Sequence, residues 1–108
     1  MNTDTICRLN NDLRSGRSTD GKVLITNGIQ ALGIDAITKI YQRVAEYDDF
    51  TPDNDPYSEH DFGVFDFDGR RIYWKIDYYD LSLTVGSQDP ADPSITTRVL
   101  TIMLAEEY

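Results

Sequence analysis

Apolar residues recur at intervals of three and four near the start of the chain. Ile6, Leu9 and Leu13 follow this spacing, which places them on one face of a helix. The stripe predicts an amphipathic helix from about residue 3 to residue 14, and the Ser15–Gly16 pair after it is typical of a helix end. A single apolar stripe indicates that this helix packs on a core along one side.

A longer apolar stripe predicts a second helix over residues 34–47. Gly33 precedes this stripe and Pro52 follows its end, as expected for helix boundaries. Between the two helices, residues 23–25 form a brief apolar run rich in β-branched side chains. The run predicts a short strand, and the approach to a helix beginning near Asn27 is the alternative.

Residues 51–58 are rich in Pro, Asp and Asn and predict a loop, after which a β-hairpin is predicted around Asp68–Gly69. Asp-Gly is a favoured pair for a type I′ turn, and this turn fixes the register of the two strands. The predicted pairs are Phe67 with Arg70, Asp66 with Arg71, Phe65 with Ile72, Val64 with Tyr73, and Gly63 with Trp74. One face then joins opposite charges, and the other collects an apolar set for the core, namely Phe65, Phe67, Ile72, Trp74 and Ile76.

Two further elements are predicted in the last third of the chain. Residues 81–85 alternate apolar and polar side chains and predict a third strand, in a meander with the hairpin. The Asp-Pro pair at 92–93 is typical of a helix start, and the residues after it predict a helix over 93–107 that is apolar around most of its circumference. Such a helix is either central to the core or covered by another subunit.

These elements predict one α+β domain over residues 1–108. Its antiparallel sheet has three to four strands, the hairpin plus a third strand, with about three helices packed on one face. A chain of 108 residues with 40% apolar content fits a single core. No apolar run approaches the roughly 20 residues that cross a bilayer, no secretory signal is evident, and the single Cys7 excludes an internal disulfide. We therefore expect a cytoplasmic protein.

Negative charge is concentrated in the middle of the chain. The formal net charge is −9, and twelve of the 19 acidic residues but only three of the ten basic residues lie between Asp48 and Asp92. Aromatic residues are interleaved with these acids, which indicates a folded acidic surface and not a disordered tail. Such a surface repels nucleic acid and attracts basic grooves.

The spacing of the acids suggests a partner type. Carboxylates two residues apart in an extended chain are separated by about 7 Å, which is comparable to the distance between successive phosphates on one nucleic acid strand. Three pairs have this spacing: Asp53 with Asp55, Glu59 with Asp61, and Asp66 with Asp68. They predict charge mimicry of nucleic acid, in which lysines and arginines that normally hold phosphates bind carboxylates. An ordinary solvated acidic surface is the alternative. The candidate partner-binding residues are Asp48, Asp49, Asp53, Asp55, Tyr57, Glu59, Asp61, Asp66, Asp68, Asp77 and Asp80.

Glu59, His60 and Asp61 form the cluster best suited to bind a metal or move a proton, because His60 is the sole imidazole and carboxylates flank it. Their spacing matches neither a zinc pattern nor a calcium loop. The alternative is that they fasten the loop by hydrogen bonds to the backbone. Cys7 is expected to be a small buried hydrophobe. No nucleophile elbow, phosphate loop or dinucleotide fingerprint is present, so we predict no catalytic residue, no metal ligand and no cofactor.

Two blocks of the sequence resemble a bacterial family, number 3768 among the domains of unknown function. They read AEYDDFTPDNDPYSEHDFGVFDFDGRRIYWKIDYYD (45–80) and DPADPSITTRVLTIMLAEEY (89–108), and the similarity extends from about Ile6 onward. The resemblance implies a small cytosolic protein, often carried on plasmids or other mobile elements of alphaproteobacteria, and it implies no reaction. Mobile elements commonly encode small acidic inhibitors of host defence, including anti-CRISPR proteins, and the chain is similar to these in size and charge.

Three hypotheses follow. The first is a non-enzymatic inhibitor, an anti-CRISPR protein that binds a type I CRISPR surveillance complex (Cascade) and blocks target DNA binding with its acidic face. Its partner is then a basic nucleic-acid-binding protein, with no direct contact to nucleic acid or membrane. The second is a structural or regulatory interaction module of a mobile element that forms a homodimer through the helix 93–107. The third is a metal-dependent hydrolase around His60.

Overall fold

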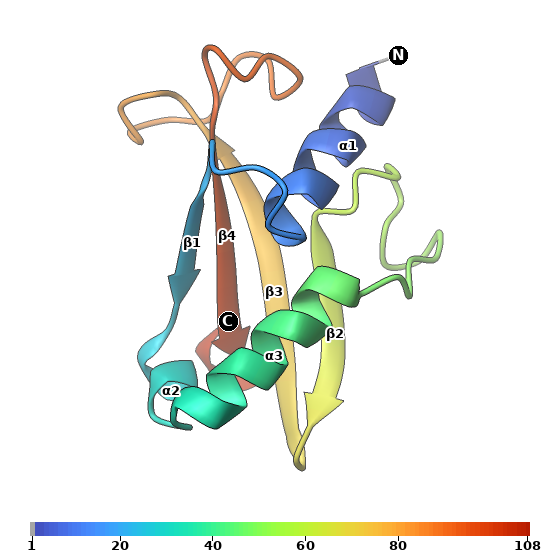
Figure 1. Cartoon of the computed structure of the whole chain (residues 1–108). Coiled ribbons are helices and arrows are strands. Elements are labelled where there is room, and N and C mark those ends of the chain that lie inside the picture. The colour runs from blue at the N-terminus through green and yellow to red at the C-terminus, as the bar shows by residue number, and fades with distance from the viewer. Residues whose placement is uncertain (1) are drawn as a thin grey trace.

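The computed structural model describes residues 2–108 and has an α+β fold, as predicted (Figure 1). Three α-helices lie on one face of a four-stranded sheet. The elements are α1 (Asn2–Arg14), β1 (Lys22–Ile25), α2 (Asn27–Gln30), α3 (Ile34–Glu46), β2 (Phe62–Phe67), β3 (Arg70–Tyr79), β4 (Thr97–Leu104) and the 3-10 helix η1 (Ala105–Glu107). In this described part of the chain, no helix has the length and apolar character needed to cross a bilayer.

The two helices predicted from apolar stripes are confirmed as α1 and α3. Both alternatives for the region between them are realised one after the other, because residues 22–25 form a strand and α2 begins at Asn27. The helices bury one face each, as their spacing requires. Ile6 and Leu13 of α1 and Ile40 and Val44 of α3 are buried.

The strand order in the sheet is β1-β4-β3-β2. β3 pairs antiparallel with both β2 and β4, whereas β1 pairs parallel with β4. The sheet is therefore mixed, and the prediction of a purely antiparallel sheet is corrected at β1. β4, the last strand in the sequence, lies beside β3 in the centre of the sheet, and β1 and β2 form its two edges.

The hairpin of β2 and β3 has the predicted register at every pair, including Asp66 opposite Arg71 and Gly63 opposite Trp74. Asp68 and Gly69 have φ of 51° and 80°, the two positive values that a type I′ turn requires. The turn residues alone therefore fixed which side chains face the core. Three of those on β3 are fully or almost fully buried, namely Ile72, Trp74 and Ile76.

The predicted helix over residues 93–107 is wrong. The Asp92 carboxylate accepts hydrogen bonds from the Ser94 backbone N–H at 2.9 Å and its hydroxyl at 2.6 Å, which makes a turn, and β4 and η1 follow. β4 is buried on both faces, with Val99 and Met103 almost as inaccessible as the side chains beneath the helices. A strand buried on both faces reads as a continuous apolar run, which periodicity does not distinguish from a buried helix. The helical surface of the dimer hypothesis is therefore not formed.

The predicted strand over residues 81–85 is also wrong, because Asp80 folds this segment into a turn. The Asp80 carboxylate accepts hydrogen bonds from Thr84 N at 3.0 Å and Thr84 Oγ1 at 3.1 Å. Leu83 has φ of 61°, a left-handed conformation that no extended strand contains. The apolar side chains of the segment are exposed, and β4 takes the place of the predicted third strand.

Candidate functional site

The connection between α3 and β2 is a long irregular segment, residues 47–61, which we call the acidic loop. It contains six carboxylates and no lysine or arginine. Loops of this length without secondary structure are uncommon in compact domains and are usually either functional loops or linker segments. The way in which the loop is fixed determines which of its acids face outward.

Asp55 is an internal support of the acidic loop. Its side chain is only 6% exposed, and one carboxylate oxygen accepts hydrogen bonds from the backbone N–H groups of Glu59 and His60 at 3.1 and 3.2 Å. Ser58 and His60 have φ of 56° and 57°, and the buried carboxylate holds this left-handed turn in place. Asp55 was predicted to contact a partner, but it is occupied inside the loop.

A second set of contacts fixes the first half of the loop. The rings of Phe50 and His60 stack with their centroids 3.7 Å apart. The Asn54 side chain accepts from Thr51 N at 2.8 Å and donates to the Asp49 carbonyl at 2.9 Å. Because these contacts join both halves of the acidic loop, its backbone has a defined shape without belonging to a helix or strand.

Arg14 of α1 anchors the start of the loop. It is 5% exposed, and its guanidinium donates to the carbonyls of Val44 at 2.7 Å and Tyr47 at 2.8 Å, at the C-terminal end of α3. Burial lowers the pKa of Arg14, but an arginine stays charged at neutral pH, and its positive charge is favourable at a helix C-terminus. The same guanidinium lies over the ring of Phe50.

Asp48, Asp49 and Asp53 are the acids that the loop turns outward. All three are exposed, and within residues 2–108 their carboxylates have no hydrogen-bond or ion-pair partner. Asp48 and Asp49 line a hollow of about 330 Å³ together with Glu46 and one base, Arg43. Several unpaired carboxylates close together on a fixed backbone attract cationic side chains. Asp48, Asp49 and Asp53, with the exposed Tyr57, are therefore the candidate site.

Glu59 faces the interior. Its carboxylate accepts a hydrogen bond from the Tyr78 hydroxyl at 2.8 Å, and its backbone carbonyl accepts one from the Asn10 side chain at 3.0 Å. Asn10 also donates to the Tyr78 hydroxyl at 2.7 Å and accepts from Arg98 Nε at 2.9 Å. Burial raises the pKa of Tyr78. This buried polar network joins the end of the acidic loop to α1, β3 and β4.

Asp61 is half-buried, and replacing it with asparagine should stabilise the protein near pH 7. Burial, followed by the nearby Glu59 carboxylate, raises the pKa of Asp61 above its ordinary value of 3.8. The folded state therefore binds this proton more tightly than the unfolded chain, and stability falls as the pH rises from 3.8 through the raised pKa. Thermal unfolding across a pH series should show a higher midpoint for Asp61→Asn at pH 7 and a difference that shrinks toward pH 3.8. The exposed Asp53→Asn is the control, and an Asp61→Asn difference independent of pH would contradict this assignment.

Both ring nitrogens of His60 face other side chains of the protein. Its Nδ1 lies 3.1 Å from Asn11 Oδ1, and its Nε2 lies 3.8 Å from the Asp55 carboxylate. Burial lowers the pKa of His60 from 6.5, so the ring is neutral at pH 7.

Cys7 lies 3.6 Å from the Asn11 amide nitrogen, and burial raises the pKa of its thiol, which opposes nucleophilic reactivity. No group of three or more His, Cys, Asp or Glu side chains in residues 2–108 is placed to hold a metal ion.

The other predicted acids lie away from the acidic loop. Asp66 pairs with Arg71 at 3.2 Å, and Asp77 pairs with Lys75 at 2.8 Å. Asp68 forms the hairpin turn, and Asp80 holds the turn after β3. The structure therefore brings together only part of the predicted set, and three of the candidate partner-binding acids, Asp55, Asp68 and Asp80, build local turns instead.

Arg14 and Asn10 both donate hydrogen bonds to the acidic loop, and the sequence analysis did not identify either of them. Asn10 is fully buried, although it is polar, and it occupies the apolar stripe of α1 four residues after Ile6. A polar residue inside an apolar stripe is the signal that could have identified it, because buried polar groups need partners. Arg14 follows Leu13 at the end of the same helix and carried no comparable signal.

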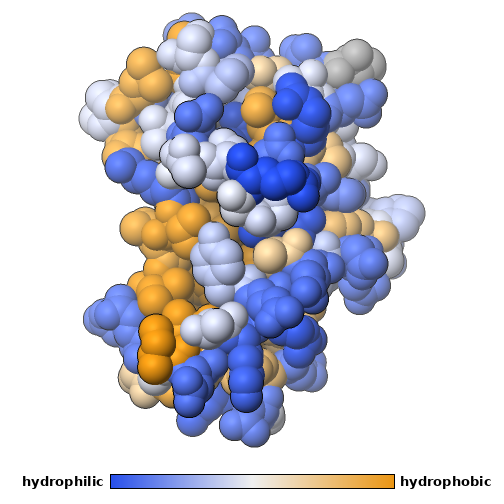
Figure 2. Space-filling model, in the orientation of Figure 1, coloured by the Kyte–Doolittle hydropathy of each residue, from blue (hydrophilic) through white to orange (hydrophobic). Residues whose placement is uncertain are grey.

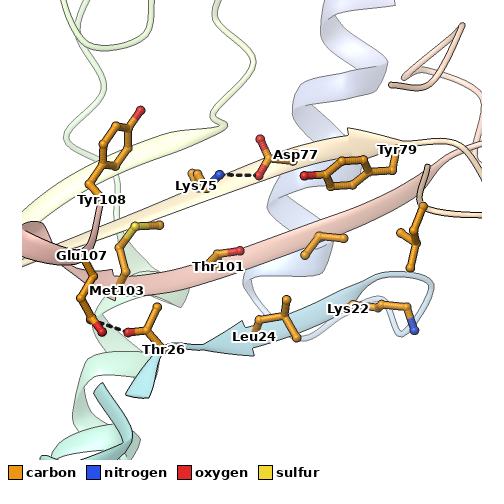
Figure 3. A pocket seen from close by; sticks show the side chains of 12 residues that line it. Lys22, Leu24, Thr26, Lys75, Asp77, Tyr79, Thr101, Met103, Glu107 and Tyr108 are labelled. Carbon is orange, nitrogen blue, oxygen red and sulfur yellow. Dashed lines mark hydrogen bonds and ion pairs between the residues drawn. The ribbon is translucent and has the colours of Figure 1, made fainter. Parts of the chain in front are cut away.

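The sheet face opposite the helices has no helix packed on it and forms a second surface. A groove with a volume of about 600 Å³ runs along it. Val99, Thr101 and Met103 of β4 line it. Two bases and two acids also line it, namely Lys22, Lys75, Asp77 and Glu107 (Figure 3). Lys75 is ion-paired with Asp77, and this hydrogen bond raises the pKa of Lys75. The groove therefore has balanced charge, unlike the acidic loop.

Comparison with known proteins gives a family but no activity. Neither the curated proteins nor the solved structures contain a match to the chain. The family model described as "Protein of unknown function (DUF3768)" matches residues 25–107, which include the last residue of β1, every element from α2 to η1 and the whole acidic loop. The chain therefore belongs to the DUF3768 family.

Proposed function

We propose that the protein is a non-enzymatic inhibitor that binds a basic, nucleic-acid-binding surface of another protein through its acidic loop. The observation that carries this proposal is the set of exposed carboxylates of Asp48, Asp49 and Asp53 on a loop whose inner side is fixed by Asp55 and Arg14. Unpaired carboxylates form charge-assisted hydrogen bonds with arginine and lysine. Because the loop is already ordered, binding costs little conformational entropy.

Tyr57 adds a second kind of contact to this surface. Its side chain is 76% exposed and lies in the acidic loop four residues after Asp53. Tyrosine is enriched among the residues that dominate binding energy at protein interfaces. Charge then guides the encounter and the aromatic ring contributes packing, which suits a protein partner better than a loose counter-ion.

The form of mimicry is local charge and not a regular phosphate spacing. Asp53 faces outward but Asp55 is buried, and Asp66 is already paired with Arg71. The two-residue spacing that motivated the sequence hypothesis therefore does not support the proposal. The support comes from the concentration of unpaired acids between the end of α3 and Tyr57.

The partner class is the DNA-binding surface of a type I CRISPR surveillance complex. On this proposal the protein is an anti-CRISPR encoded by a bacterial mobile element, acts in the cytoplasm, and prevents target DNA from binding. Size, a net charge of −9 and the acidic loop support this assignment, and the link to anti-CRISPR proteins is by analogy. An anionic protein repels DNA itself, so the inhibited step is the binding of DNA by a cationic protein.

Charge reversal within the acidic loop should abolish inhibition without unfolding the protein. The triple variant Asp48→Lys, Asp49→Lys, Asp53→Lys should lose at least about tenfold in affinity for the complex, which corresponds to about 1.4 kcal/mol, with an unchanged circular dichroism spectrum. Binding to immobilised complex measures this affinity.

The matched control makes the same change in net charge elsewhere. The residues Asp20, Asp35 and Glu106 are exposed and lie outside the acidic loop, and their triple reversal to lysine should reduce affinity much less. Equal losses in the two variants would show that only overall charge matters and would remove the acidic loop as the binding site.

A further inference from the structure

The two edges of the sheet differ in how they are covered. At the β2 edge, the Tyr47 hydroxyl contacts the Val64 backbone N–H at 3.5 Å, and Asp66 adds a charge near the end of the strand. Covering residues and charges of this kind protect an edge from pairing with another chain. Among the strands of residues 2–108, β1 pairs with β4 alone, and both of its central side chains are exposed, Val23 by 38% and Leu24 by 53%.

The hydrogen-bonding direction of β1 follows from its last contact with β4. Thr26 N donates to the Ile102 carbonyl at 3.1 Å, so Leu24, two residues earlier, also directs its backbone groups toward β4. The N–H and C=O groups of Val23 and Ile25 then point to the free edge. The Ile25 carbonyl accepts a hydrogen bond from Gln30 Nε2 at 3.0 Å, and its second lone pair is available to another donor.

Charges of opposite sign lie at the two ends of this strand. Lys22 is at the beginning of β1, and the Glu107 carboxylate accepts a hydrogen bond from the Thr26 hydroxyl at 2.6 Å just beyond its end (Figure 3). Leu24 lies between them on the same open face. Hydrophobic surface gathers along the side of the molecule where β1 runs (Figure 2).

We infer that β1 pairs with β1 of a second copy of this chain, antiparallel about a two-fold axis through Leu24. An antiparallel copy is self-complementary here, because each Lys22 then lies beside the Glu107 of the other copy. Val23 and Ile25 form hydrogen-bonded pairs across the axis, and the two Leu24 side chains meet in a non-hydrogen-bonded pair. The two four-stranded sheets join into one continuous sheet.

This arrangement keeps the acidic loops apart. The acidic loop leads into β2, at the opposite edge of the sheet from β1 (Figure 1). The dimer therefore joins the two molecules at an edge with balanced charge and leaves the two acidic loops at its far ends, where their repulsion is weakest. The inference does not depend on the proposed function, because it uses none of the residues of the acidic loop.

Disulfide trapping tests both the contact and its register. In a Cys7→Ser background, Leu24→Cys should form a covalent dimer on mild oxidation, because Cα atoms in a non-hydrogen-bonded pair are about 4.5 Å apart, within the range that a disulfide spans. Val23→Cys is the matched control: the two residues at position 23 are offset along the strands, about 8 Å apart, and should form little dimer. Equal yields from the two variants, or none from Leu24→Cys, would overturn the register.

Sedimentation of the unmodified chain tests the association itself. A mass that rises with concentration toward twice 12.3 kDa is expected. Val23→Pro should keep the protein monomeric and folded, because it removes an N–H that points away from β4. Lys22→Glu should weaken the dimer at least about tenfold by placing like charges together. A wild-type protein that stays monomeric at all concentrations up to the millimolar range would overturn the inference.

Discussion

Replacing Trp74 with alanine should lower the free energy of unfolding by about 3–5 kcal/mol. Trp74 is completely buried in the middle of β3, beneath Tyr47 and Phe50, whose rings meet the indole edge-on at centroid distances of 5.5 and 6.2 Å. Removing the indole deletes these contacts and leaves a cavity that the rigid sheet fills poorly. Urea unfolding monitored by circular dichroism gives the change.

A neighbouring aromatic residue supplies the control for Trp74. Tyr73 precedes it on the same strand but lies on the open face and is only half-buried, so Tyr73→Ala should cost clearly less. Gly63 gives an independent check, because a β-carbon at that position would collide with the indole of Trp74, and Gly63→Ala should also destabilise the fold. A loss below about 1 kcal/mol for Trp74→Ala would contradict the position of this side chain in the core.

Replacing Arg14 with methionine should cost about 2–4 kcal/mol. The guanidinium is buried and donates to the carbonyls of Val44 and Tyr47. Methionine fills much of the volume but leaves these carbonyls without their donor and removes a positive charge from the end of α3. Denaturant unfolding measures the loss.

Arg14→Met should also loosen the acidic loop, since Arg14 contacts its first residue and lies over Phe50. Amide hydrogen exchange within residues 47–61 should become faster in this variant even under conditions where the sheet remains protected. Arg17→Met is the control, because Arg17 is exposed and forms only a surface ion pair with Asp12. Unchanged exchange in the loop would show that Arg14 does not order it.

The hairpin was predictable to the residue because its information is local. Asp68 and Gly69 accept the positive φ values of one turn type, and that turn sets every pair from Phe62 to Lys75. The helices α1 and α3 were predictable for a similar reason, since each buries one face and keeps the other polar.

The last strand was not predictable from periodicity because both of its faces are buried. Val99 and Met103 lie on one face and Leu100 and Ile102 on the other, and all four are almost inaccessible. Their spacing fits a buried helix as well as a central strand. The many β-branched residues between 95 and 102 were the better guide, because they favour strands.

The direction in which each acid faces depends on contacts between distant parts of the chain. The acidic loop was predictable as a loop, but Asp55 faces inward while Asp53 faces outward. The Asp55 carboxylate is held inward by the backbone N–H groups of Glu59 and His60. Arg14 from α1 and the stacking of Phe50 on His60 hold the loop in the shape that allows this. Such contacts leave no trace in local spacing, so composition identified the acidic segment but not its exposed members.

We propose that the exposed acids of the loop occupy the surface that a nucleic-acid-binding partner uses for DNA. The most direct test of this proposal is a competition measurement, in which the protein is titrated into a purified type I surveillance complex with labelled target DNA at several salt concentrations. We expect displacement of DNA, a half-inhibitory concentration that increases with the DNA present, and inhibition that weakens steeply with salt. Unaltered DNA binding at a saturating concentration of the protein would contradict it.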